Sequence, residues 1–182
     1  MPVVVIVLLI AIIILCSIGI VFINCYNKIN KALLKINDAE ISIDEDLRNM
    51  YDLVIKAINI IEKSIKTENK IFKELRNVKS DEYSNFEINR ILNSAYNEIL
   101  KISDDYEKIN NNKIFKGILN KLNEIEEKLI ALRTFYNKYT YEYNILVRTF
   151  PSNIVGFLGG YRAKKQYDGK DLNDEEVRDF KI

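Results

Sequence analysis

Hydrophobic side chains recur every three and a half positions through the second half of the chain. Alternating steps of three and four from Phe115 to Phe150 meet only apolar or aromatic residues, namely Phe115, Ile118, Leu122, Ile125, Leu129, Leu132, Tyr136, Tyr139, Tyr143, Leu146 and Phe150. Such a heptad repeat places all of these side chains on one stripe of an α-helix, which leaves water by packing against other helices in a left-handed bundle. The pattern therefore predicts one long helix that packs on others from the same chain.

The same stepping continues through two other parts of the chain. One stripe covers residues 29–78 and is interrupted only by Glu40, Ser64 and Glu68, and another covers residues 88–109. Each predicts a long helix with one apolar face, and no proline or glycine breaks the first of them. The polar residues Ser64 and Glu68 predict a bend or a break near the end of that helix.

Turn-forming residues separate the three stripes. Residues 79–85 are rich in Ser, Asp and Asn, and residues 110–112 are three asparagines in a row. These residue types favour turns and helix N-caps, and short turns between long helices make neighbouring helices antiparallel. The predicted fold class is therefore all-α, with an antiparallel up-and-down bundle of three to four long helices.

An uncharged stretch of 21 residues, Val3 to Ile23, precedes the bundle. As a helix rising about 1.5 Å per residue it covers about 30 Å, the thickness of the hydrocarbon core of a bilayer. A cleaved signal peptide would have a basic segment before a shorter apolar core, whereas Pro2 precedes this stretch with no Lys or Arg. The sequence predicts a retained single transmembrane helix. Both cysteines lie in or beside it, so the rest of the chain cannot form a disulfide.

Basic residues lie on one side of the predicted membrane helix. Lys28, Lys31 and Lys35 follow it closely, and no basic side chain precedes it. Because cytoplasmic flanks of membrane helices are enriched in Lys and Arg, we expect a single-pass protein of the plasma membrane with its N-terminus outside and its helical bundle in the cytoplasm.

The helical pattern ends at Phe150 and Pro151, because proline lacks a backbone N–H and restricts the residue before it. The following residues are small and apolar, and beyond Tyr161 the chain becomes densely charged, as is typical of flexible ends. The predicted domains are a transmembrane anchor (1–27), an antiparallel helical bundle (28–151) and a flexible C-terminal tail (152–182).

Composition argues against several classes of function. The formal net charge is +1 with 29% charged residues, so no strong field favours nucleic acid. The chain has no histidine, the commonest general base and a common metal ligand. We expect no catalytic activity, no metal and no cofactor. A carboxylate enzyme that uses Glu40 or Asp52 with tyrosines is disfavoured, because carboxylates on a bundle face are usually solvated charge.

The last long helix also carries a spaced motif, E-x-x-L-x-x-x-R-x-x-Y-N-x-x-x-x-x-Y-N-x-x-x-x-x-F-P. Its residues are Glu126, Leu129, Arg133, Tyr136, Asn137, Tyr143, Asn144, Phe150 and Pro151. This string resembles the LemA family of bacterial membrane proteins, and the likeness continues at Tyr26-Asn27 and over residues 43–53. Where the family usually has Trp and a Leu-Ile-Pro-Asn stretch, this chain has Leu53-Val54-Ile55-Lys56, so we expect a straighter first helix.

The resemblance implies a single-span anchor with the N-terminus outside and a LemA-like four-helix bundle. The resemblance does not bring with it an established enzymatic activity. Members of this family often look like partners of a membrane-bound zinc metalloprotease, so the resemblance implies a protease of that class as a candidate partner. The resemblance leaves the oligomeric state open.

The two Tyr-Asn pairs of the motif are one heptad apart and allow two interpretations. In the first, Tyr136 and Tyr143 belong to the core, and Asn137 and Asn144 tie neighbouring helices together. In the second, the asparagines form a polar row with Arg133 that receives a helix or peptide of a partner. Together with Phe150 and Pro151, these residues are the predicted partner surface.

Two functions fit the predicted architecture. The first is a membrane-anchored scaffold or adaptor that binds other membrane or cytoplasmic proteins. The alternative is a signalling coiled coil, in which the anchor continues rigidly into the first helix and relays a signal across the membrane.

Overall fold

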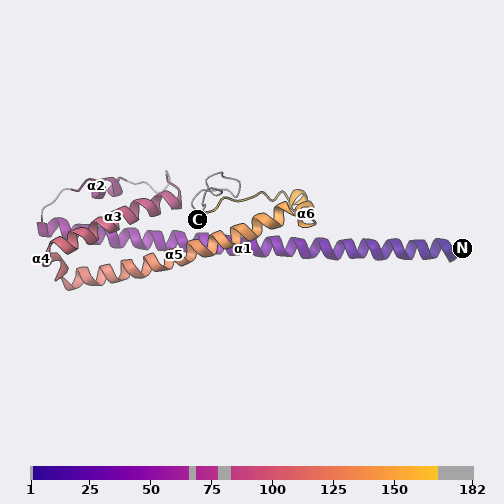
Figure 1. The fold of residues 1–182 in the computed structure, drawn as a ribbon, viewed down its shortest axis with the longest axis horizontal. Coiled ribbons are helices and arrows are strands. Elements are labelled where there is room, and N and C mark those ends of the chain that lie inside the picture. The colour runs from indigo at the N-terminus through magenta and orange to yellow at the C-terminus, as the bar shows by residue number, and fades with distance from the viewer. Residues whose placement is uncertain (1, 66–68, 78–82, 168–182) are drawn as a thin grey trace, which may run out of the picture. The chain divides into compact units, whose positions relative to one another are not determined.

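Every element of the described chain is a helix (Figure 1). The computed structural model describes residues 2–65, 69–77 and 83–167. The helices are α1 (Pro2–Ile65), α2 (Lys70–Arg76), α3 (Asn85–Asp105), α4 (Glu107–Asn110), α5 (Lys113–Arg148) and α6 (Ser152–Leu158). The prediction of an all-α chain is confirmed for these residues.

Helix α1 begins with the stretch predicted to span a membrane. All of its large apolar side chains from Val3 to Ile23 are exposed. In length and composition α1 is suited to cross a membrane, and it is the one helix of the described ranges that meets both criteria. The helix then continues without interruption to Ile65, one residue after the predicted break at Ser64.

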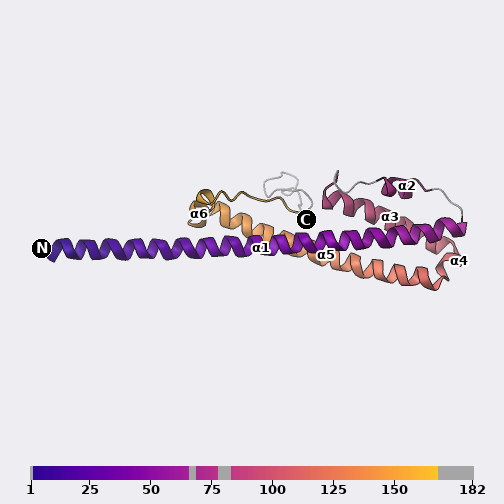
Figure 2. The same cartoon turned by 180° about the vertical axis from the view of Figure 1, so that it is seen from behind.

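The chain forms two compact units, and both use parts of α1 and α5. Unit 1 combines residues 1–38 with residues 136–182, of which 2–38 and 136–167 are described. Its core joins the first part of α1, the last part of α5 and α6 through the buried side chains of Ile29, Ala32, Ile36, Tyr143 and Val155. Figures 1 and 2 both show α6 beside α1 in this unit.

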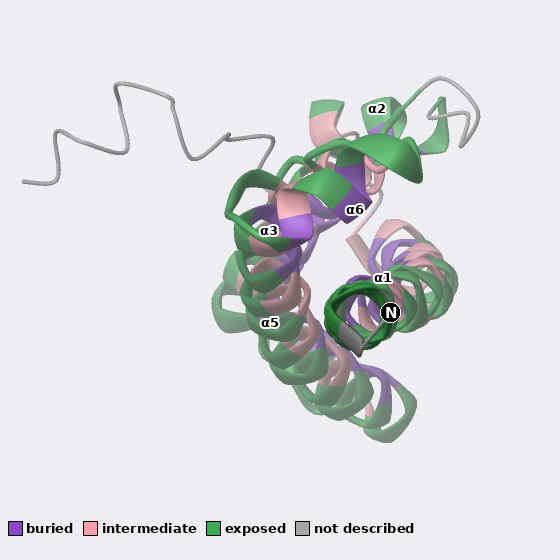
Figure 3. Ribbon diagram, turned by 90° about the vertical axis from the view of Figure 1, so that its right-hand side faces the viewer, coloured by how far each residue is buried: buried purple, intermediate pink, exposed green. Residues whose placement is uncertain are grey.

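Unit 2, residues 39–135, holds the rest of α1 and α5 together with α2, α3 and α4. Its largest fully buried side chains include Met50, Ile58, Phe72, Leu92, Ile99 and Phe115. Polar contacts join α2 to α1 and α3 to α5, and α2 also packs on α3. In Figure 3 buried ribbon forms stripes along the helices, while exposed ribbon covers their opposite faces.

The predicted apolar seam of α5 is buried along most of its length. From Phe115 to Leu146 every seam position is buried or half-buried. The prediction is wrong at its last member, because Phe150 lies beyond the end of α5 and is 79% exposed. On α1 the seam from Ile29 to Ile61 is buried or half-buried except at Glu40, which is exposed as expected for a solvated acidic side chain.

Side-chain caps define the helix starts near the predicted turns. The Ser84 hydroxyl accepts a hydrogen bond from the Glu87 N–H (3.3 Å), and the Glu87 carboxylate accepts one from the Ser84 N–H (2.9 Å), a complete capping box for α3. The Asn112 side chain accepts from the Ile114 N–H at the start of α5. Residues 78–82 of the first predicted turn lie outside the described residues.

The structure differs from the sequence prediction after Pro151. The sequence predicts a flexible tail from residue 152 on, whereas 152–158 form α6 and 161–167 are hydrogen-bonded to α5 and α1. Gly156 of α6 packs against Val147 of α5, since a Cβ at Gly156 would lie 3.4 Å from the Val147 Cα, an ordinary van der Waals contact. Residues 168–182 of the predicted tail lie outside the described residues.

Candidate functional site

The two Tyr-Asn pairs of α5 hold an extended segment of the same chain. We call Tyr136, Asn137, Tyr143 and Asn144 the Tyr-Asn ladder, and residues 161–167 the C-terminal strap. Both belong to unit 1. The strap has no helical structure, and its backbone lies against the ladder through hydrogen bonds from each of the four side chains.

The second pair of the ladder makes the tighter contacts. The Tyr143 hydroxyl donates to the Arg162 carbonyl (2.9 Å). The Asn144 Nδ2 donates to the Lys164 carbonyl (2.8 Å), and the Asn144 Oδ1 accepts from the Lys164 N–H (2.9 Å). The amide of Asn144 therefore binds both polar groups of one peptide residue, as a neighbouring β-strand would.

The first pair repeats this pattern further along the strap. The Asn137 Oδ1 accepts from the Tyr167 N–H (2.7 Å), and the Tyr136 hydroxyl lies 3.5 Å from the Lys165 carbonyl. The Tyr136 and Tyr167 rings also meet edge to face, with centroids 6.1 Å apart, a favourable aromatic geometry.

The heptad spacing of the pairs matches an extended backbone. The strap residues bound by the first pair, 165 and 167, each lie three positions after those bound by the second pair, 162 and 164. Seven helical residues rise about 10.5 Å, and three extended residues span about 10 Å. Two turns of α5 therefore have about the same length as three residues of the antiparallel strap. Every one of these hydrogen bonds uses the strap's main chain.

The side chains of Tyr143 and Asn144 are buried, so their hydrogen bonds depend on the protonation state and on the shape of these side chains. Asn144 is 1% exposed and Tyr143 is 2% exposed. Burial, with a smaller contribution from Tyr161, raises the pKa of the Tyr143 hydroxyl above the ordinary tyrosine value. The hydroxyl thus stays protonated and able to donate to the Arg162 carbonyl.

Tyr161 fixes the start of the strap against α1. Its hydroxyl donates to the Asn30 Oδ1 (3.0 Å), and its ring meets the Tyr26 ring edge to face at 6.5 Å. The chain reverses at Gly160, whose φ of 69° lies in the left-handed region that glycine adopts readily. At Gly159 a Cβ would approach the Tyr161 ring to 2.5 Å.

The structure does not place Arg133 in the ladder. The Arg133 guanidinium lies in unit 2, 3.2 Å from the Glu126 carboxylate, and its Nε donates to the Leu129 carbonyl. Asn93 of α3 donates to the same carboxylate (3.3 Å). Of the predicted polar row, Asn137 and Asn144 act together, whereas Arg133 takes part in a separate contact between α3 and α5.

Phe150 and Pro151 lie where the chain turns from α5 into α6. Pro151 is the N-cap residue of α6, and the Phe150-Pro151 peptide bond is cis. The Phe150 side chain extends into solvent. These two residues therefore form a separate surface from the ladder in unit 1.

Sequence reasoning missed a buried charge in unit 2. Asp46 is 3% exposed and its Oδ1 lies 2.9 Å from the Lys128 Nζ, while its Oδ2 has no hydrogen-bond partner in the described structure. Asp46 stands beside the heptad stripe and not on it, so periodicity gave no signal for it. The strap gave no signal for a different reason, since its hydrogen bonds to the ladder use its main chain.

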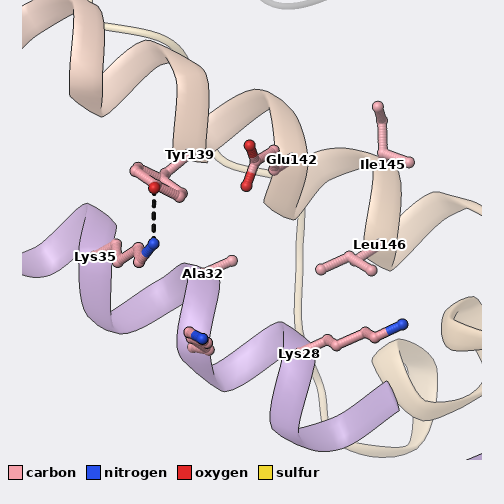
Figure 4. Close-up of a pocket in the computed structure, with 8 residues that line it drawn as sticks. Lys28, Ala32, Lys35, Tyr139, Glu142, Ile145 and Leu146 are labelled. Atoms are coloured by element: carbon pink, nitrogen blue, oxygen red, sulfur yellow. Dashed lines mark hydrogen bonds between the residues drawn. The ribbon is translucent and has the colours of Figure 1, made fainter. Parts of the chain in front are cut away.

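A shallow pocket of about 470 Å³ lies between α1 and α5 of unit 1 (Figure 4). Its charged lining consists of Lys28, Lys31, Lys35 and Glu142. The Lys35 ammonium donates to the Tyr139 hydroxyl (2.7 Å) and lies 4.1 Å from the centre of the Tyr139 ring. The pocket therefore carries more cationic than anionic side chains.

Comparison with known families supports the motif found in the sequence. The family model described as the LemA family matches residues 39–179, which include the whole ladder and strap. No curated protein matches the chain.

Proposed function

The chain belongs to the LemA family, and from that premise we propose that it is a single-pass membrane adaptor. Its α1 anchor holds a helical body at the membrane, and this body binds a partner protein. In the proposed arrangement, unit 2 is an antiparallel up-and-down four-helix bundle. The proposal gives the chain no catalytic step.

The anchor is supported by the contrast along α1. The large apolar side chains from Val3 to Ile23 are exposed, whereas Ile29 and the apolar seam residues that follow it are buried or half-buried. Exposed apolar surface of this length is costly in water and favourable in a bilayer, where each Leu, Ile or Val contributes about −0.3 to −0.6 kcal/mol. The lysines after the anchor favour a cytoplasmic body and an outside N-terminus, and we propose the plasma membrane as the location.

One observation carries the adaptor function: the ladder binds an extended peptide backbone. Its hydrogen bonds reach the main-chain groups of the strap. Because every peptide offers those groups, an extended segment of another protein can make the same bonds once the strap leaves. We propose that the strap is the resting occupant of this site and that a partner's segment replaces it.

A protein partner follows from this chemistry, and a membrane-bound zinc metalloprotease is a candidate because the family resemblance implies one. Nucleic acid is not a proposed partner, since the formal net charge is only +1. The bilayer is the second partner through α1.

Photo-crosslinking in cells tests the adaptor function. A crosslinking amino acid replaces Tyr136, which contacts the strap, and captured proteins are compared among three strap sequences. Lys164→Pro removes the N–H that donates a hydrogen bond to Asn144. The strap should therefore leave the ladder more often, and partner capture should increase. Ala163→Pro is the matched control, because the bond from the Tyr143 hydroxyl to the Arg162 carbonyl and both bonds between Asn144 and Lys164 keep their atoms.

The adaptor proposal expects more captured partner with Lys164→Pro than with wild type or Ala163→Pro. A crosslinking pattern confined to the chain itself in all three would contradict it. Equal capture of a partner by all three would show that the partner reaches position 136 without displacing the strap, which would refute the proposed replacement.

The continuity of α1 favours a second candidate function. A helix that runs from Pro2 to Ile65 without interruption could transmit a motion from the membrane to the body. Two glycines inserted after Asn27 would decouple the two parts, because glycine weakens helices. An adaptor would keep its partner after this insertion, and a relay would lose its signal.

A further inference from the structure

Large apolar side chains are exposed at the end of α5 and on α6. Phe150 is 79% exposed, Ile154 is 50%, Phe157 is 84% and Leu158 is 66%. The opposite face of α6 packs on the body through the buried Val155. Several large exposed side chains within nine residues form an apolar patch of the kind that marks an interaction site.

The patch lies close to the end of the membrane stretch. Val155 shares a core with Ile29, and Tyr161, three residues after α6, contacts Tyr26 and Asn30. Ile29 follows Ile23 by six residues, which is about 9 Å along a helix. The polar headgroup layer on each side of a bilayer is about 5–7 Å thick, so α6 stands at the membrane surface when α1 spans the bilayer. Figure 3, viewed from the N-terminal end of α1, shows exposed ribbon on α6.

Cationic side chains on the same unit match such a surface. Lys28 and Lys31 are exposed on α1 at the pocket shown in Figure 4, and Arg162 and Lys165 are exposed on the strap. Glu142 is the one carboxylate among the residues that line this pocket. Each Lys or Arg near an anionic leaflet contributes about 1 kcal/mol to attraction.

We propose that α6 is a second membrane contact, an interfacial helix that inserts Phe150, Ile154, Phe157 and Leu158 into the bilayer leaflet from which α1 emerges. This inference rests on the proposed anchoring of α1. A helix of seven residues is too short to hold a membrane alone, but α1 keeps it at the surface, so insertion is an intramolecular step at high effective concentration. Two contacts from one unit fix the height and rotation of unit 1 on the membrane, which a single helix does not.

The absence of tryptophan from the chain permits a direct test. Single-tryptophan variants of the full chain are placed in phosphatidylcholine–phosphatidylglycerol vesicles, with and without bromine on the acyl chains, which quenches nearby tryptophan. Phe157→Trp probes α6, and Ile12→Trp reports on the anchor. Tyr141→Trp is the matched control on unit 1, since Tyr141 is 47% exposed and lies about 10 Å along α5 before its last residue, Arg148.

We expect brominated lipid to reduce the emission of Phe157→Trp roughly twofold, because interfacial helices bury their apolar face about 5–10 Å into the boundary of headgroups and acyl chains. Ile12→Trp should be quenched more strongly, and Tyr141→Trp should be nearly unaffected. The inference would be overturned if Ile12→Trp is quenched but Phe157→Trp is quenched no more than Tyr141→Trp. That result would leave the anchor in place.

Two other results would also overturn it. A blue-shifted but unquenched Phe157→Trp would mean that a protein, such as a second copy of the chain, covers α6 in place of lipid. An unquenched Ile12→Trp would refute the anchor itself, and the interfacial role of α6 would fall with it.

Discussion

Replacing Asn144 by Asp separates the two hydrogen bonds that hold Lys164. The substitution keeps the size of the side chain and the oxygen that accepts from the Lys164 N–H, but it removes the Nδ2 donor to the Lys164 carbonyl. The new carboxylate oxygen then faces that carbonyl. Asn137→Asp is the matched control, because the bond from the Tyr167 N–H to Asn137 uses only the oxygen that Asp retains.

The cost of Asn144→Asp follows from its surroundings. Losing one donor and leaving its acceptor without a partner costs about 1–3 kcal/mol. A carboxylate at a position that is 1% exposed adds a desolvation penalty, so we expect a total near 3 kcal/mol. Since 1.4 kcal/mol is a factor of ten, the strap should open roughly a hundredfold more often. Asn137→Asp should change opening by less than about threefold, because its one bond becomes charge-assisted.

Amide hydrogen exchange of the full chain measures this opening, since exchange reports local opening free energies. The strap amides of Lys164 and Tyr167 should exchange much faster in Asn144→Asp and nearly as in wild type in Asn137→Asp. The amides of α5 should stay protected in both, which separates release of the strap from unfolding. Equal exchange of the strap in wild type and Asn144→Asp, or a larger effect of Asn137→Asp, would refute the ladder.

Three other predictions concern stability. Burial raises the pKa of the Tyr143 hydroxyl, so the protonated hydroxyl stabilises the fold fully below the ordinary tyrosine pKa of 10.0, and this stabilisation is lost as the pH rises through the raised pKa. In an ultraviolet absorbance titration, Tyr143→Phe should therefore remove one tyrosine that titrates at high pH. Ser84→Ala removes the capping box of α3 and should cost about 1 kcal/mol, measured as faster amide exchange in the first turn of that helix while α5 is unchanged. In thermal unfolding, Lys128→Ala should destabilise unit 2 more than Asp46→Leu does. Lys128→Ala leaves the buried Asp46 carboxylate unpaired, whereas Asp46→Leu leaves a lysine that is 60% exposed and can turn to water. The reverse order of stability would contradict this account.

Periodicity predicted the helical part of the fold because burial of an apolar stripe repeats with the helix. The seam from Phe115 to Leu146, the end of α1 near Ser64 and the capped start of α3 at Ser84 all have side-chain signals of that kind. The division of α3 from α4 at Tyr106 had none, since the apolar stripe continues across it to Ile109. Phe150 fitted the period but lies beyond the last turn of α5.

The ladder could be recognised from the sequence, but its occupant could not. The spacing of the Tyr-Asn pairs predicted a polar row of Asn137 and Asn144 with Arg133, and in the structure the two asparagines bind residues 164 and 167 of the same chain. The strap showed no corresponding pattern, because it contributes carbonyls and N–H groups that every residue has. The glycines just before the strap and its own charged residues are typical of a flexible end.

The same asymmetry bears on how the site can work. If side chains of the strap were recognised, few other peptides could compete with it, and the ladder would be a structural clasp. When the ladder recognises the main chain, the competition between the strap and another peptide depends on the entropic cost of ordering that peptide and on its local concentration. The strap is covalently attached, so a soluble peptide competes poorly, whereas a partner confined to the same membrane is concentrated near the ladder. Anchoring by α1 is therefore part of the binding mechanism we propose: a partner segment should displace the strap in vesicles that hold both proteins and fail to do so, at the same total amount, when it is added as a free peptide.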